Sequence, residues 1–245
     1  MVGVIAMKEK IAEVKCIKHI YADKTEVKVC GLSFIVYRGE RVVLIGPNGS
    51  GKTTLLHHLI GLLKPVEGRI KVFGLDPYEN FNEIIKRIGV VFQNVDEQLI
   101  GPTVWDDIAF TPLNYGLDKE EVGKRVNNIM KELKIEHLKD KIPHYLSGGE
   151  KKKVAIAGAL VMEPELLILD EALSEIDPVS KKLIIDKLME LNKKKGMTII
   201  LATNDIDIVK EFATVLYLLE NGRIKYKGDP QKFFRKKFKF EVCRH

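Results

Sequence analysis

Cysteine is scarce in this sequence of 245 residues, which contains only Cys16, Cys30 and Cys243. Their odd number and irregular spacing give no sign of a disulfide framework or of a zinc site. Few cysteines are typical of a protein that works in a reducing compartment, so a cytosolic location is expected. At 45% hydrophobic and 30% charged residues, the composition is that of an ordinary globular protein and excludes a disordered chain or a fibre.

Long apolar runs are also missing. A membrane-spanning helix needs about 18 consecutive apolar residues, whereas the longest runs here, at 166–169 and 197–202, have the length of buried strands. The apolar segment 1–7 is shorter than the core of a secretory signal peptide and has no basic region before it. We therefore expect a chain that neither crosses a membrane nor is exported by this route, so that any membrane role depends on a partner.

The excess of positive charge is small, with 40 lysines and arginines against 34 acidic residues. A net charge of +6 does not by itself indicate a nucleic-acid-binding surface. The lysine runs Lys151–Lys153 and Lys193–Lys195 are interpreted as solvated faces. The basic tail at 231–245 is interpreted as a frayed, solvated end, with contact to anionic lipid or to a partner as the alternative.

The pattern of apolar residues predicts an α/β fold. Alternation favours antiparallel strands at 11–20 and 27–40, and an unbroken apolar run predicts a strand covered on both faces at 41–46. A glycine-rich turn and a helix at 53–63 follow that strand, an order typical of a phosphate-binding unit. Further strands are predicted at 69–74, 87–93, 165–170 and 197–203, helices at 148–162 and 179–195, a mostly helical insertion at 94–145, and a hairpin at 214–228 that turns at Asn221-Gly222.

The glycine-rich turn matches the P-loop pattern G-x-x-x-x-G-K-[ST] in full. Because it lies between a predicted strand and a predicted helix, its context is the one that the pattern requires. Bare backbone N–H groups and a helix N-terminus supply a positive field for phosphates, while the lysine reaches the β- and γ-phosphates and the last hydroxyl binds Mg²⁺. The residues are Gly46, Pro47, Asn48, Gly49, Ser50, Gly51, Lys52 and Thr53.

Two carboxylates end the buried run at 166–169. Asp170 and Glu171 should lie at the carboxyl edge of the sheet, where α/β proteins bind their ligands. There Asp170 can hold Mg²⁺ through water, and Glu171 can act as the general base for a water molecule. A structural acid at a strand end is the alternative for each of them.

A second anion-binding pattern follows the helical insertion. Ser147, Gly148 and Gly149 combine a hydroxyl with bare N–H groups at the start of a helix. One triphosphate does not need two such nests, so we expect this one to contact a nucleotide held by a second subunit. An ordinary N-cap is the simpler alternative.

With these three motifs, the chain resembles the nucleotide-binding subunit of ABC transporters over nearly its whole length. The resemblance implies that ATP and Mg²⁺ are bound, that Tyr21 stacks on adenine, and that Thr54 joins the phosphate contacts. It also implies that Gln93 contacts Mg²⁺ and the attacking water and links to a transmembrane partner, and that Asn204 lies in the switch segment.

The resemblance also implies a fold and a domain plan. A P-loop NTPase (RecA-like) core is expected with an antiparallel β subdomain and a helical subdomain specific to ABC proteins. The ATP-binding domain should span 8–228, with the helical subdomain at about 94–158, and 229–245 should form a short basic tail.

The segments QNVDEQLIGPTVWDDIAFTPLNYGL and LSGGEKKKVAIAGALVMEPELLILDE resemble the energy-coupling-factor importers of cobalt, nickel or vitamins. This implies a peripheral subunit at the cytoplasmic face of the membrane, paired with a second ATPase subunit. The partners would be a transmembrane coupling protein and a substrate-binding membrane protein, with no nucleic acid. Trp105 and Phe110 are candidate contacts to the membrane partner, with core packing as the alternative.

The sequence departs from the family pattern in three places, the last of which covers two residues. Asn204 replaces the usual switch histidine, Ala172 replaces a proline, and Glu175-Ile176 stand where smaller residues are common. Asparagine can donate a hydrogen bond but cannot be protonated, so the alternative to a full ATPase is an ATP-sensing, weakly hydrolytic subunit of a heterodimeric pair. A soluble ABC-type ATPase acting on nucleic acid or ribosomes is a further rival, but the long insertion or second cassette usual in those relatives is missing from this sequence.

Overall fold

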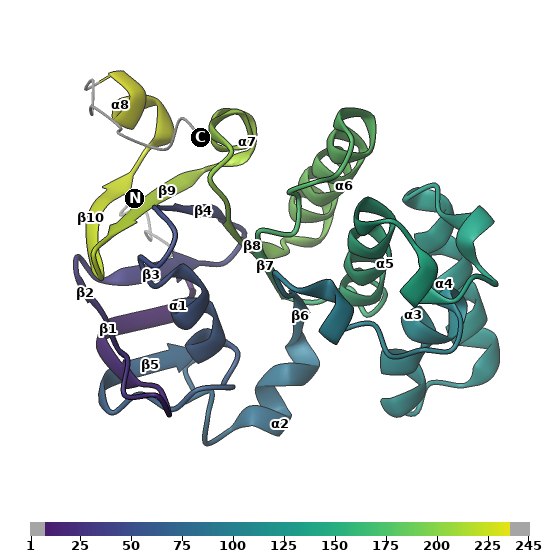
Figure 1. Cartoon of the computed structure of the whole chain (residues 1–245), viewed down its shortest axis with the longest axis horizontal. Helices are drawn as coiled ribbons and strands as arrows, with labels where there is room; N and C mark the ends of the chain where they lie inside the picture. Colours follow the sequence, from purple (N-terminus) through teal and green to yellow (C-terminus); the bar gives the residue numbers. More distant parts are fainter. Residues whose placement is uncertain (1–7, 236–245) are drawn as a thin grey trace, which may run out of the picture. The chain divides into compact units, whose positions relative to one another are not determined.

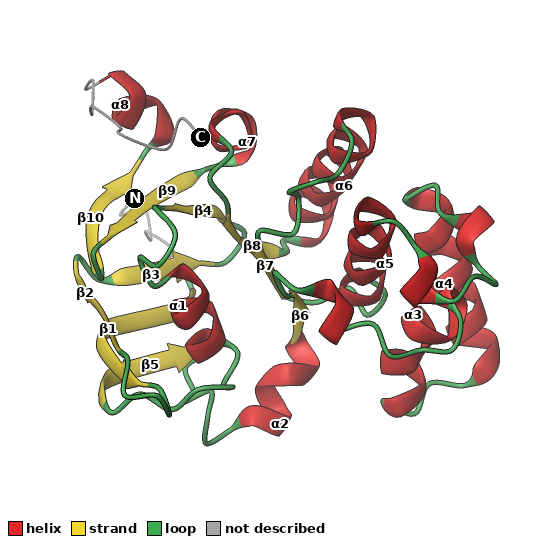
Figure 2. Cartoon of the chain, in the orientation of Figure 1, coloured by secondary structure: helices red, strands yellow, loops and turns green. Residues whose placement is uncertain are grey.

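The structure, a computed structural model, describes residues 8–235 and divides into two compact units. The first unit comprises 8–85 together with 206–235, and the second comprises 86–205. Figure 1 labels their elements along the chain and Figure 2 distinguishes their helices from their strands. Residues 1–7 and the basic stretch 236–245, which carried expectations about export and about lipid contact, lie outside the described residues.

The first unit is built mainly of strands. Within it the strands are hydrogen-bonded in the order β3-β1-β2-β10-β9-β4, and β5 pairs with β1 as well. Its elements are β1 (Lys10–Ile20), β2 (Glu26–Gly31), β3 (Phe34–Tyr37), β4 (Arg41–Ile45), α1 (Lys52–Leu59), β5 (Glu67–Val72), α2 (Phe81–Ile84), α7 (Ile206–Phe212), β9 (Val215–Glu220), β10 (Arg223–Gly228) and α8 (Pro230–Arg235).

Strands from the last part of the described chain pair with strands from its first part in this unit. Strand β10 runs parallel to β2, pairing Arg223 with Cys30, and β9 runs parallel to β4. The hairpin β9–β10 turns at Asn221-Gly222, as the sequence predicted, because both residues take positive φ angles of 46° and 68°. The first part of the tail is not frayed: Pro230–Arg235 forms helix α8, which buries Pro230 and Phe233.

The second unit combines a parallel sheet with helices. Strands β6, β7 and β8 are parallel neighbours in that order, and every residue of β7 and β8 is buried. Helix α5 packs against β6 and α3, and α3 packs against α4. The elements are β6 (Ile88–Val91), α3 (Val104–Asn114), α4 (Lys119–Glu132), α5 (Gly148–Leu160), β7 (Leu166–Asp170), α6 (Pro178–Lys195) and β8 (Thr198–Ala202), with single 3-10 turns at Val95–Glu97, Glu136–Leu138 and Pro143–Tyr145 and another at Ile85–Arg87, on the boundary with the first unit.

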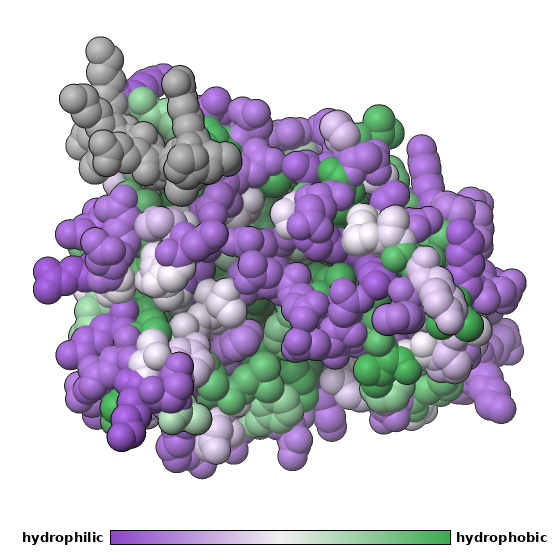
Figure 3. Space-filling model, viewed as in Figure 1, coloured by the Kyte–Doolittle hydropathy of each residue, from purple (hydrophilic) through white to green (hydrophobic). Residues whose placement is uncertain are grey.

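Most side chains on the face seen in Figure 3 are hydrophilic, with smaller hydrophobic areas between them. Of the helices that the structure describes, none combines the length and the apolar character needed to cross a bilayer.

The two lysine runs differ in their exposure to solvent. Lys193, Lys194 and Lys195 are exposed as expected, but the interpretation of Lys151–Lys153 as a solvated face is wrong for Lys152, which is 5% exposed.

A disulfide joins Cys16 of β1 to Cys30 of β2. The expectation that no cysteine is paired is therefore wrong for these two residues. Their spacing in the sequence carries no recognisable pattern, and it is the pairing of β1 with β2, in which Ile17 lies opposite Val29, that brings them together.

Reduction of this disulfide is expected to lower the free energy of unfolding by about 3 kcal/mol, because the bond closes a loop of about fifteen residues in the unfolded chain. Denaturant unfolding with and without reductant measures the difference, and a Cys16→Ser variant should show no response to reductant. Digestion of the unreduced protein should give the Cys16 and Cys30 peptides as one linked species. Separate peptides without reduction would contradict the assignment.

Helix α1 carries a buried histidine near its end. His58 is fully buried, its Nδ1 lies 2.7 Å from the Thr54 carbonyl oxygen, and its ring meets that of His19 edge-on at 5.0 Å. Burial holds the pKa of His58 below its ordinary value of 6.5. The unfolded chain therefore binds a proton that the folded chain does not, in the range between the lowered pKa and 6.5.

Stability is therefore expected to fall as the pH drops through about 6.5 towards the lowered pKa of His58, and to be unaffected by this group above that range. Thermal unfolding between pH 5 and pH 8 measures the trend. A His58→Leu variant should show a flatter dependence than an exposed His137→Leu control. Equal slopes for the wild type and His58→Leu would contradict the assignment.

Candidate functional site

The glycine-rich turn lies between β4 and α1, as predicted. Gly46 leaves β4 beside the β9 backbone, where a Cβ atom would lie 2.0 Å from the carbonyl oxygen of Leu219, so only glycine fits. Gly51, with φ 104°, is the N-cap of α1 and has no side chain to cap the helix. The first-turn N–H groups of α1 therefore meet no capping side chain, which is the arrangement that suits an anion.

Lys52 points back into this turn. Its ammonium donates to the Gly46 carbonyl oxygen at 2.8 Å and to that of Pro47 at 3.4 Å, and the residue is 6% exposed. The hydroxyl of Ser50 is buried without a hydrogen-bond partner among the described residues. A fixed positive charge and an unused hydroxyl thus lie within the same loop as the uncapped helix end.

Tyr21 is brought to the same helix from the turn after β1. Its hydroxyl lies 2.8 Å from the hydroxyl of Thr54, and its ring meets that of His19 edge-on at 4.5 Å. The structure therefore gathers Tyr21, Thr54 and the glycine-rich turn in the first unit, although Tyr21 and Thr54 are 33 residues apart.

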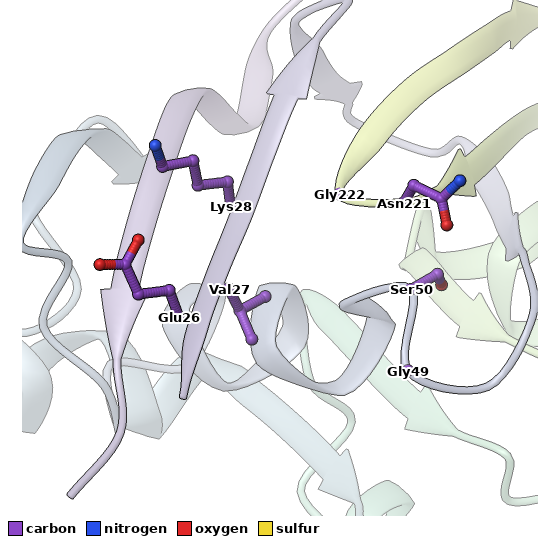
Figure 4. A pocket seen from close by; sticks show the side chains of 7 residues that line it. All are labelled: Glu26, Val27, Lys28, Gly49, Ser50, Asn221 and Gly222. Carbon is purple, nitrogen blue, oxygen red and sulfur yellow. The ribbon is translucent and has the colours of Figure 1, made fainter. Parts of the chain in front are cut away.

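A cavity of about 370 Å³ opens beside the turn. Figure 4 shows that β2 forms one side of it, opposite Gly49, Ser50 and the tip of the last hairpin. Asn221 at that tip was recognised from the sequence only as a turn residue. No local signal could have placed it here, because its position depends on the pairing of β10 with β2. The cavity is lined by Glu26, Val27, Lys28, Gly49, Ser50, Asn221 and Gly222.

In the second unit, the two acids lie at the end of β7 as predicted. Asp170 is 3% exposed and pairs in register with Ala202 of β8. Glu171 donates its backbone N–H to the Ala202 carbonyl oxygen at 3.0 Å and takes a positive φ of 48°. Its carboxylate Oε2 accepts a hydrogen bond from Nε2 of Gln93 at 3.3 Å, so two predicted site residues that are 78 positions apart meet.

Ser147 forms the N-cap of α5 in a capping box. Its hydroxyl donates to the Glu150 carboxylate at 2.7 Å, and its backbone N–H donates to the same carboxylate at 2.9 Å. These hydrogen bonds lower the pKa of Glu150. Ser147 is therefore an N-cap, as the simpler alternative proposed. The backbone N–H groups of Gly148 and Gly149 lie in the first turn of the helix.

A cavity of about 550 Å³ lies between these elements of the second unit. It brings Gln93, Glu171 and Gly148 of the same chain to one space, a proximity that the sequence did not predict. Its other neighbours come from the turn after β6, from α5 and from the loop after β7: Asn94, Val95, Asp96, Lys151, Lys152, Ser174 and Glu175.

The remaining candidates lie on the surface of the second unit. Asn204 follows β8 and is exposed, while the neighbouring Asp205 carboxylate accepts a hydrogen bond from Lys181 at 3.0 Å. On helix α3, Phe110 is 49% exposed and Trp105 is half-buried, so core packing does not account for Phe110.

Comparison with known proteins assigns the family. The family model described as ABC transporter matches residues 29–174. The energy-coupling factor transporter ATP-binding protein EcfA of Methanocaldococcus jannaschii is 45% identical over 227 residues, covering 91% of this chain and 81% of that protein. The corresponding EcfA of Methanococcus maripaludis is 44% identical over the same shares of the two chains.

Solved structures agree in fold. CbiO1 of Clostridium perfringens, described as part of the CbiONQ ABC transporter complex, matches with a TM-score of 0.81 at 40% identity, covering 94% of this chain and 92% of that one. An ATP-binding cassette solved as a dimer with ADP and phosphate matches with a TM-score of 0.80 at 27% identity, covering 89% and 98%. The predicted P-loop NTPase fold is thereby confirmed, and the chain belongs to the ATP-hydrolysing subunits of ABC transporters, in the branch that includes the energy-coupling factor proteins.

Proposed function

We propose that this chain is the Mg-ATP-hydrolysing subunit of an energy-coupling-factor importer for cobalt or nickel ions or for a vitamin. The observation that carries the catalytic part is the hydrogen bond from Gln93 to Glu171 at the end of the buried strand β7. An amide that orients a carboxylate at such an edge suits the activation of a water molecule. Similarity to the energy-coupling factor proteins and to CbiO1 supports the importer type, whereas the solutes are those implied by the family resemblance of the sequence.

In this proposal the residues of the first unit bind the nucleotide. Tyr21 leaves Thr54 and stacks on adenine, the loop 46–51 and the N-terminus of α1 surround the phosphates, and Lys52 turns from its carbonyl partners to the β- and γ-phosphates. The buried Ser50 hydroxyl and the hydroxyl of Thr54 add donors to the phosphate contacts. The uncapped start of α1 supports this assignment, because its N–H groups have no side-chain cap to displace.

Mg²⁺ would be held by oxygen donors: the Thr53 hydroxyl is the candidate ligand in the first unit, and the buried Asp170 carboxylate and Gln93 are the candidates in the second. Hard oxygen ligands of this kind fit Mg²⁺, which usually keeps several waters and phosphate oxygens. The ion would neutralise charge on the transferred phosphoryl group. Glu171 would then accept a proton from the attacking water.

The domain plan and the assembly belong to the same proposal. Residues 8–228 would form the ATP-binding domain, with the helical subdomain at about 94–158. Ser147, Gly148 and Gly149 would contact the γ-phosphate of a nucleotide bound by a second ATPase subunit. The dimeric ATP-binding cassette among the similar structures supports this arrangement. Phe110, exposed on α3, is the candidate contact for a transmembrane coupling protein, which would place the chain peripherally at the cytoplasmic face of the membrane.

Co-purification tests the transport assignment. The chain is tagged at its natural expression level, the membranes are solubilised in mild detergent, and the recovered proteins are identified. Two hydrophobic membrane proteins are expected, one for coupling and one for binding solute, in complexes whose ATPase activity rises when the solute is present. Recovery of ribosomes or nucleic acid without membrane proteins would favour the soluble rival instead.

An ATP-sensing subunit with weak hydrolysis is the second candidate function, and Asn204 is the observation that favours it. Asparagine at an exposed position after β8 can donate to a γ-phosphate oxygen but cannot carry a proton. In that case a paralogous partner would perform most of the turnover.

Replacement of Asn204 with histidine separates the two candidates. If the chain is a sensing subunit, Asn204→His should raise ATP turnover by about a hundredfold, the lower end of the range for a general acid–base side chain. Steady-state phosphate release at saturating ATP measures this turnover. Asn82→His is the control, because Asn82 is exposed. Asn192 is unsuitable as a control, because its side-chain amide is buried and donates to the Met197 carbonyl oxygen. Normal turnover by the wild type with no gain from Asn204→His would exclude the sensing role.

A further inference from the structure

Lys152 is the buried member of the lysine run on helix α5. It is 5% exposed, and its ammonium donates to the Ser174 hydroxyl at 2.5 Å and to the Ser174 carbonyl oxygen at 2.9 Å. The carboxylate of Glu175 lies 3.9 Å away. Burying an ammonium is unfavourable unless hydrogen bonds and charge compensate it, and here both are supplied by the loop that follows β7.

Ser174 in turn holds the backbone of Glu171. Its N–H donates to the Glu171 carbonyl oxygen at 3.1 Å, and its hydroxyl donates to the same oxygen at 2.8 Å. These two hydrogen bonds join the middle of the loop to the backbone of Glu171, the residue assigned as the general base. Since the Ser174 hydroxyl can donate only one proton, its bond to Glu171 leaves its lone pairs to accept from Lys152.

The backbone of this loop adopts conformations that need support. Glu171 and Glu175 have φ angles of 48° and 62°, in the left-handed region that non-glycine residues seldom occupy. Such conformations persist when the surrounding contacts fix them, and they cluster at functional sites. Lys152, through Ser174, supplies contacts of that kind between the two residues.

Helix α5 approaches the loop closely at its start as well. A Cβ atom at Gly149 would lie 3.2 Å from the Glu175 carbonyl oxygen, and one at Gly148 would lie 3.5 Å from the Glu175 carboxylate. The Gln93 amide completes the arrangement from the other side by donating to Glu171. The side chain of Glu171 is thus oriented by Gln93, while its backbone is fixed through Ser174 by Lys152.

We propose that Lys152 is a positioning residue for ATP hydrolysis, which holds the loop 171–175 so that the Glu171 carboxylate faces its water. This inference rests on the proposed role of Glu171 and extends it to a residue on another helix. Lys152 itself touches no reacting atom. It acts through Ser174, so its removal misplaces the general base and leaves the nucleotide contacts of the first unit intact.

Lys152→Met tests the proposal, because methionine keeps most of the side-chain volume and removes the charge. The value of kcat is expected to fall about tenfold to a hundredfold, as for a general base displaced by about an ångström, while KM for ATP stays within about twofold. Lys152→Arg, which can still donate to Ser174, should recover part of the loss. Lys182→Met, which removes an exposed lysine paired with Asp186, is the control and should keep the wild-type kcat.

A double-mutant cycle distinguishes positioning from general destabilisation. Ser174→Ala alone should lower kcat in the same way, and because Ser174 is exposed this variant tests the relay even if Lys152→Met fails to fold. The double variant should lose no more than the larger single loss, since both changes break one relay. Additive losses in kcat, or a parallel rise in KM, would overturn the proposal.

The failure of this inference differs from the failure of the proposed function. If the purified wild-type chain neither binds nor hydrolyses Mg-ATP, the proposed function is wrong and Lys152 has no reaction to serve. If the wild type hydrolyses ATP and both Lys152→Met and Ser174→Ala match its kcat, the proposed function stands and the positioning role is overturned.

Discussion

Replacement of Glu171 with glutamine is expected to lower ATP turnover by about a hundredfold to ten-thousandfold, the range for loss of a general base. Glutamine has nearly the same shape as glutamate and can still meet the Gln93 amide through its carbonyl oxygen. It cannot accept a proton from water. Affinity for Mg-ATP should therefore remain near that of the wild type, while the nucleotide, once bound, is no longer consumed.

A second consequence follows for assembly. If each nucleotide is shared between two chains, a chain that binds ATP without hydrolysing it should accumulate as a dimer when Mg-ATP is present. Size-exclusion chromatography with light scattering measures the mass with ATP, with ADP and without nucleotide. Glu83→Gln, an exposed change on α2, serves as the control and should show wild-type turnover. A Glu171→Gln chain that stays monomeric with Mg-ATP, or hydrolyses ATP normally, would contradict the proposed site.

Replacement of Lys52 with alanine is expected to weaken binding of Mg-ATP by about a hundredfold. A hydrogen bond from an ammonium to a charged oxygen contributes about 1.5–3 kcal/mol, and about 1.4 kcal/mol is a factor of ten in affinity. Loss of the contacts to two phosphates should therefore lower the affinity by two or more factors of ten. Isothermal titration calorimetry with Mg-ATP measures the change directly.

Lys52 also supports the conformation of the loop itself, because it donates to the carbonyl oxygens of Gly46 and Pro47. Thermal unfolding without nucleotide must therefore accompany the binding measurement, and Lys52→Met provides a second variant that preserves the side-chain volume. Lys64→Ala, an exposed lysine in the same unit that pairs with Glu79, is the control for loss of one positive charge. Equal affinities for Lys52→Ala and the wild type, both folded, would refute the phosphate-binding role of the loop.

The sequence predicted the elements whose signals are local. The buried strand at 41–45 followed by glycines and a helix, the strand at 166–170 that ends in acids, and the hairpin turn at Asn221-Gly222 were all readable from residue type and spacing. Each of these depends on burial of a short run or on backbone conformations that few residues adopt. Their positions in the structure differ from those predicted by only a few residues.

Features that depend on tertiary pairing could not be predicted in this way. Strand β1 pairs with β2, β3 and β5, and the first of these pairings creates the Cys16–Cys30 disulfide. Lys152 belongs to a run of three lysines with nothing in the sequence to separate it from its neighbours. Lys152 is buried because α5 approaches the loop after β7, and this approach cannot be predicted from the periodicity of apolar residues.

The division of the chain has a consequence for its synthesis on the ribosome. Residues 86–205 are contiguous, so this unit can fold as soon as they have left the exit tunnel. The other unit interleaves the two ends of the chain, since β2 and β4 take β10 and β9 as parallel neighbours. Strands β2 and β4 must therefore wait, with open edges, until β9 and β10 have been synthesised, and open edges of this kind are prone to pair with another chain.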